Sequence, residues 1–81
     1  MHSEAEEVNG YLFKCQIVQD NYRKYICTVA FVRAADRGKR GAPENRRKIM
    51  ELFDTAEEAL AAGMAFGKVC AENHQTGIPL G

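Results

Sequence analysis

Two stretches of the chain alternate apolar and polar residues with the period of a β-strand. Tyr11–Gln19 and Tyr25–Arg33 are rich in β-branched and aromatic residues, and a polar cluster separates them. The odd positions of each stretch share one face, so the pattern predicts a β-hairpin with those faces in the core. Paired residue numbers must then add to an even value, as for Cys15 opposite Cys27 with a loop at Asp20–Tyr22.

The second half of the chain predicts a long loop, a third strand and a helix. Residues 34–45 contain two glycines and a proline, which are typical of a loop, and a strand is expected over residues 46–53. The sequence Thr55-Ala56-Glu57-Glu58 is a capping box that predicts the start of a helix. Apolar residues at helical spacing continue to near Asn73.

These elements predict an α+β fold in which one C-terminal helix packs on one face of a three-stranded antiparallel sheet. Gly63 and Gly67 are four positions apart on the apolar stripe of the helix and predict a close approach to the sheet. We expect a single β-β-β-α domain over residues 10–73. A disordered acidic tail is expected over residues 1–9, and a frayed tail over residues 74–81.

The even positions of the predicted hairpin are less polar than a solvent-facing surface usually is. They include the candidate protein-interface residues Leu12, Val18, Ile26 and Val32. One helix covers only one face of a sheet, so the other face is a candidate interface for a second copy or another protein. The alternative is that the N-terminal segment or the C-terminal tail folds over it.

Basic residues are concentrated around the predicted long loop. Residues 33–48 contain seven of the eleven basic residues of the chain, against two acidic residues, Asp36 and Glu44. A cationic loop beside a sheet can follow a phosphate backbone, which makes this basic cluster a candidate nucleic-acid site. The alternative is a solvated loop, since a formal net charge of zero weakens long-range attraction. The basic cluster consists of Arg33, Arg37, Lys39, Arg40, Arg46, Arg47 and Lys48.

The sequence gives little indication of catalysis, a metal or a cofactor. Cys15, Cys27 and Cys70 are widely spaced, which favours buried thiols in a reducing cytosol over disulfides. A zinc site completed by His74 is the alternative. Neither His2 nor His74 has a nucleophile or carboxylate at a spacing that implies a site. We expect a cytoplasmic protein that is not an enzyme and has no cofactor, small-molecule substrate, export signal or membrane association.

The predicted helix start resembles a pattern found in bacterial domains. Phe53-Asp54-Thr55-Ala56-Glu57-Glu58-Ala59 matches F-x-[ST]-x-E-E-A, which follows an aromatic strand in short uncharacterised bacterial β-β-β-α domains. This resemblance covers residues 10–73 and implies a fold but no activity. The order of elements is also similar to the arm-type DNA-binding domain of phage integrases, whose sheet enters the DNA groove. We therefore expect a small binding module, with nucleic acid as the leading partner and protein interaction or homodimerisation as the alternative.

Overall fold

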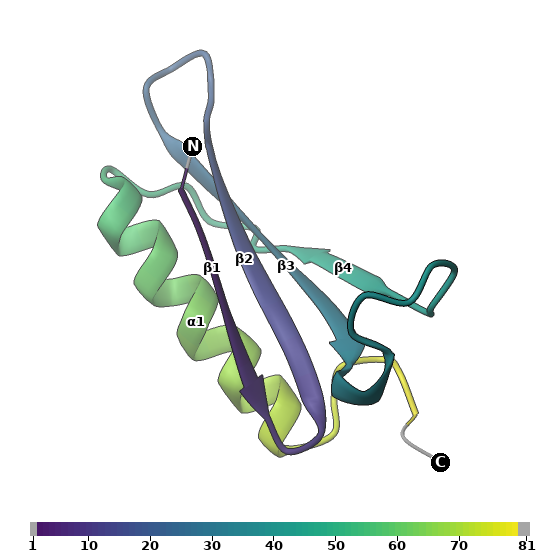
Figure 1. Cartoon of the computed structure of the whole chain (residues 1–81). Coiled ribbons are helices and arrows are strands. Elements are labelled where there is room, and N and C mark those ends of the chain that lie inside the picture. Colours follow the sequence, from purple (N-terminus) through teal and green to yellow (C-terminus); the bar gives the residue numbers. More distant parts are fainter. Residues whose placement is uncertain (1, 80–81) are drawn as a thin grey trace.

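The computed structural model describes residues 2–79, which form a four-stranded antiparallel sheet with one helix on one face (Figure 1). The strands lie in chain order across the sheet. The predicted antiparallel sheet and C-terminal helix are confirmed, but the prediction of three strands is wrong. The elements are β1 (His2–Val8), β2 (Tyr11–Gln19), β3 (Tyr25–Arg33), the short 3-10 helix η1 (Ala34–Asp36), β4 (Asn45–Lys48) and α1 (Ala56–Glu72).

The additional strand lies where a disordered tail was expected over residues 1–9. Residues 2–8 form β1 at the edge of the sheet, and Met1 lies outside the described residues. Asn9 and Gly10 have φ values of 53° and 88°, the left-handed conformation that a two-residue type I′ hairpin turn requires. This turn folds the acidic N-terminal segment back along β2.

The hairpin of β2 and β3 has the predicted faces but a different register. Phe13 pairs with Phe31, so the odd positions of both strands face the core as expected. Cys15 pairs with Val29, however, and not with Cys27. The loop is longer than predicted because an Asp20 carboxylate oxygen accepts hydrogen bonds from the backbone N–H groups of residues 22 and 24, both at 2.8 Å.

The predicted strand over residues 46–53 is interrupted. After β4, the backbone bonds to β3 only at Ile49 and Phe53. The three residues between them lie opposite Ile26 alone, so the chain bulges away from the sheet. Phe53 returns to the core, whereas Met50 in the bulge is 91% exposed.

Helix α1 begins and ends near the predicted positions. The Thr55 hydroxyl oxygen accepts a hydrogen bond from the Glu58 N–H at 3.1 Å, which caps the first turn. At the other end, His74 adopts a φ of 54°. The N–H of Gln75 then donates to the Cys70 carbonyl at 2.7 Å, as in a Schellman motif.

The segment after α1, expected to be a frayed tail over residues 74–81, packs against the sheet as far as it is described. Thr76 and Ile78 are buried. The Tyr11 hydroxyl donates to the Ile78 carbonyl at 2.8 Å, and the Asn45 amide donates to the Thr76 carbonyl at 2.7 Å. Residues 80–81 lie outside the described residues.

Two glycines let α1 approach the sheet closely, as predicted. A Cβ on Gly63 would clash with the Cys27 Sγ and lie 3.0 Å from the Cys15 Sγ. A Cβ on Gly67 would clash with the ring of Phe13. The helix therefore rests directly on the side chains of β2 and β3.

Gly63→Ala should destabilise the fold, although alanine favours a helix by about 1 kcal/mol over glycine. Overpacking of a dense core costs about 1–3 kcal/mol, which should exceed this gain and lower the melting temperature by several degrees. Thermal unfolding followed by circular dichroism measures this change in melting temperature. In the Cys27→Ala background, which makes room for the new methyl group, Gly63→Ala should lower the melting temperature much less. A G63A variant more stable than wild type would show that the helix does not lie this close.

Candidate binding surface

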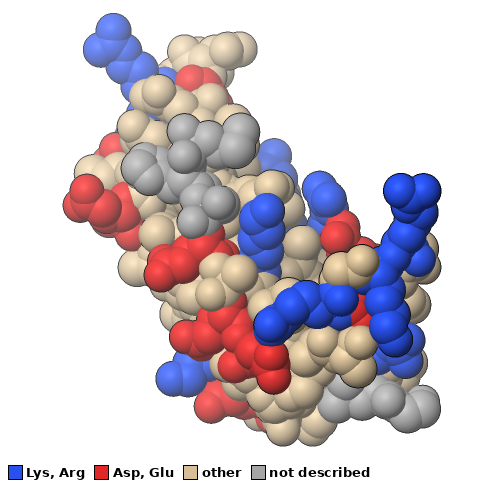
Figure 2. Space-filling model, viewed as in Figure 1, with Lys and Arg blue, Asp and Glu red and all other residues tan. Residues whose placement is uncertain are grey.

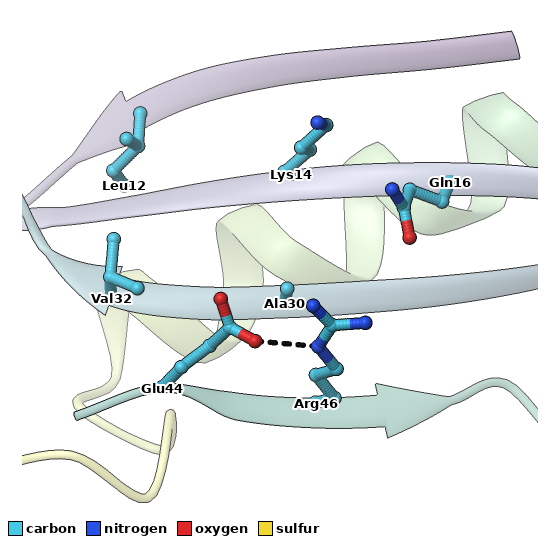
Figure 3. A pocket seen from close by; sticks show the side chains of 7 residues that line it. All are labelled: Leu12, Lys14, Gln16, Ala30, Val32, Glu44 and Arg46. Carbon is cyan, nitrogen blue, oxygen red and sulfur yellow. Dashed lines mark hydrogen bonds and ion pairs between the residues drawn. The ribbon is translucent and has the colours of Figure 1, made fainter. Parts of the chain in front are cut away.

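One face of the sheet is covered by α1, and the described chain places no second layer on the other. We call the second surface the open face. In Figure 3, which looks onto this face, α1 lies behind the sheet. The register gives the open face the even positions of β2, β3 and β4, which are Leu12, Lys14, Gln16, Val18, Ile26, Thr28, Ala30, Val32, Arg46 and Lys48.

The four predicted interface residues lie on the open face as two cross-strand pairs. Leu12 pairs with Val32, and Val18 pairs with Ile26. Leu12 and Val18 are six positions apart along β2, which corresponds to about 20 Å. Val18 is 53% exposed and the other three are half-buried. Each end of the open face thus presents an apolar pair to solvent.

Neither end of the described chain, residues 2–79, covers these pairs. β1 extends the sheet at its edge. The described part of the C-terminal segment bonds to the side chains of Tyr11 and Asn45, which point to the α1 side because Tyr11 is in the core and Asn45 pairs with the core residue Phe31. The expected alternative, a tail folded over the open face, does not occur among residues 2–79.

A pocket of about 220 Å³ lies on the open face where a small residue separates two long ones (Figure 3). Ala30 pairs with Lys14 on one side and with Arg46 on the other. Its methyl group leaves a hollow between their side chains. Neither Lys14 nor Glu44 was predicted as a site residue, because only the strand register brings them beside Arg46. The pocket is lined by Leu12, Lys14, Gln16, Ala30, Val32, Glu44 and Arg46.

The predicted basic cluster is divided by ion pairs and by the sheet. Arg46 and Lys48 lie on the open face, whereas Arg47 pairs with Val29 and faces the α1 side. Arg40, Arg47 and Lys48 have no carboxylate partner among the described residues. The ion pairs are Arg33–Asp36 at 2.6 Å, Arg37–Glu7 at 2.6 Å, Lys39–Asp36 at 3.9 Å and Arg46–Glu44 at 2.5 Å.

Charge is nevertheless unevenly distributed over the molecule. On the face shown in Figure 2, acidic side chains gather over β1 and α1, and basic side chains gather toward β4 and the loop before it. The acidic residues around the helix start do not pair with the basic cluster. Asp54 instead pairs with Lys24 of the hairpin loop.

The buried thiols show no sign of a reactive or metal-binding site. Cys15, Cys27 and Cys70 are free and buried. Burial raises the pKa of Cys15 to about 12, with a contribution from the neighbouring Cys27, and burial also raises the pKa of Cys27. Among the side chains that the structure describes, which exclude that of His2, no three His, Cys, Asp or Glu groups converge in a way that could hold a metal ion.

No protein-family model, curated protein or solved structure matches this chain. Function is therefore inferred from the geometry of the surface itself. Among the described residues, no helix is long and apolar enough to cross a membrane.

Stability should fall with rising pH between about 9 and 12 because of the buried thiols. A thiol whose pKa is raised to about 12 stays protonated in the folded protein, whereas in the unfolded chain it loses its proton near its ordinary value of 9.0. Unfolding is then favoured by about 1.4 kcal/mol per pH unit for one such thiol. Urea unfolding at pH 7.5, 9 and 10.5 should show a shallower decline for Cys15→Ala than for wild type. Equal slopes would show that Cys15 titrates normally.

Proposed function

We propose that the protein is a non-catalytic binding module that holds another protein on the open face of its sheet. The observation that carries this proposal is the uncovered pair of apolar contacts, Leu12–Val32 and Val18–Ile26, on a face with no second layer. Apolar side chains that remain partly exposed on a sheet face with no second layer commonly mark an interaction site.

The charges of the open face favour a different protein over a second copy. Lys14, Arg46 and Lys48 all lie on this face. The carboxylates of Glu7 and Glu44 on the same face are already in ion pairs, with Arg37 and Arg46. Two copies packed face to face would bring these cations together in a partly desolvated interface, and like charges there oppose association. A partner with carboxylates among apolar side chains would complement the face instead.

The spacing of the apolar pairs indicates the form of this partner. The two pairs are about 20 Å apart, and Gln16 and Thr28 between them offer hydrogen-bonding groups. A single side chain cannot reach both pairs. An extended segment or a helix of the partner can contact both at once.

Val18→Lys should abolish capture of the partner, because it places a charge in one apolar contact. Val69→Lys is the matched control, since Val69 is 51% exposed on α1 and Val18 is 53% exposed on β2. Both substitutions are on the surface, so each should change stability by less than about 0.5 kcal/mol. Proteins retained from nuclease-treated cell extract by immobilised wild type, V18K and V69K can be compared by mass spectrometry.

The expected result is a protein retained by wild type and V69K and lost with V18K. Thermal unfolding of both variants checks that they are folded. If every retained protein is kept equally by V18K, the open face is not the binding surface.

A second candidate function is nucleic-acid binding, favoured by the unpaired cations of the basic cluster. Arg40 and Lys48 have no carboxylate partner among the described residues, and Arg46 shares its face with Lys48. No aromatic side chain lies among the open-face residues of β2, β3 and β4, so bases have no stacking platform there. Binding would therefore follow the phosphate backbone.

Such binding should weaken steeply with salt and show little preference for single strands. If about three phosphates are contacted, affinity falls about 40-fold between 50 and 200 mM salt. Fluorescence anisotropy with a labelled duplex and a labelled single strand measures it. Changing Arg40, Arg46 and Lys48 together to alanine should remove most of the salt dependence. Absence of binding at 50 mM salt and tens of micromolar protein would eliminate this candidate.

A further inference from the structure

The pocket on the open face combines an apolar floor with a cationic rim. Leu12, Ala30 and Val32 form the floor, and Lys14 and Arg46 stand on opposite sides of Ala30 (Figure 3). A cavity of about 150 Å³ can hold benzene, so a volume of 220 Å³ has room for one aliphatic or aromatic side chain. The floor and the rim thus suit different parts of one ligand.

The rim already holds one carboxylate supplied by the chain itself. The Nε of Arg46 donates to the Oε1 of Glu44 at 2.5 Å, and both side chains line the pocket. Glu44 immediately precedes β4, so it reaches the rim from a loop and not from the sheet. Both side chains are partly exposed, at 63% for Arg46 and 40% for Glu44, and an ion pair of this kind is weak enough to be exchanged.

The geometry points to a specific ligand for this pocket: a partner segment that inserts a large apolar side chain and places a neighbouring carboxylate on Arg46. Glu44 occupies the place of that carboxylate in the free protein. This inference rests on the proposed function and names the chemistry that the partner must carry. Charge complementarity favours a ligand with a carboxylate, because the pocket contains two cations, Lys14 and Arg46, and only one carboxylate.

The apolar floor separates this ligand from a nucleic acid. A phosphate can also pair with the guanidinium of Arg46, but a phosphate backbone has nothing to place on Leu12 and Val32. A peptide with leucine and aspartate two positions apart in an extended chain presents both groups on one face. Such a peptide can place its leucine on the apolar floor and its aspartate on the cationic rim at the same time.

The test uses an acetylated, amidated seven-residue peptide with leucine and aspartate two positions apart among serines. Two control peptides replace the aspartate by asparagine or the leucine by alanine, and a short oligothymidylate supplies phosphate without apolar side chains. Titrations followed by NMR should shift Ala30, Val32 and the Arg46 side chain with the first peptide. Each control peptide should bind at least several-fold more weakly.

Glu44→Gln should raise the affinity for the leucine-aspartate peptide about three- to tenfold, because it removes the competing carboxylate. Asp54→Asn is the matched control. Like E44Q, it removes one negative charge from an ion pair, but the partner of Asp54 is Lys24, which does not line the pocket. The affinity of D54N should stay within twofold of wild type.

Three results would overturn the inference: an equal gain in E44Q and D54N, no gain in E44Q, or no shift at millimolar peptide. Larger shifts with oligothymidylate than with the peptide would assign the rim to phosphate and also overturn it. These outcomes are separate from the capture experiment, because loss of a partner with V18K would uphold the open face even if this pocket takes no carboxylate.

Discussion

The contact of α1 with the sheet at Gly63 and Gly67 is the constraint on which the rest of the structure depends. Without a Cβ at these positions, the helix backbone can lie against Cys15, Cys27 and Phe13. The core is then thin and dense, and close packing of this kind stabilises a small domain that can bury little surface. The buried thiols follow from the same contact, since small sulfur-containing side chains fit directly beneath the helix.

This arrangement gives all of the helix contact to one side of the sheet. β1 widens the sheet at its edge. Thr76 and Ile78 of the C-terminal segment are buried on the α1 side. Nothing within residues 2–79 is left to cover the open face. The apolar pairs and the cationic pocket on that face are therefore available for a partner.

The sequence predicted the elements with strong local signals and missed those that depend on pairing. Helix α1 was predictable because Thr55 caps it and its apolar stripe is regular. β1 was missed because its glutamates resemble a solvated tail, although Asn9-Gly10 was a recognisable hairpin-turn signal. The positions of the four candidate interface residues on the open face followed from alternation alone. The pocket did not, because Lys14, Arg46 and Glu44 meet only through a register that depends on loop lengths.

The most direct test of the account is the solvent exposure of the open face in solution. A soluble paramagnetic agent should strongly broaden the methyl signals of Leu12, Val18, Ile26 and Val32. It should leave Ile17 and Val29, which are buried on the α1 side, almost unchanged. Equal protection of both sets at low protein concentration would mean that the chain itself covers the open face. That result would contradict the central claim that this surface is free to bind a partner.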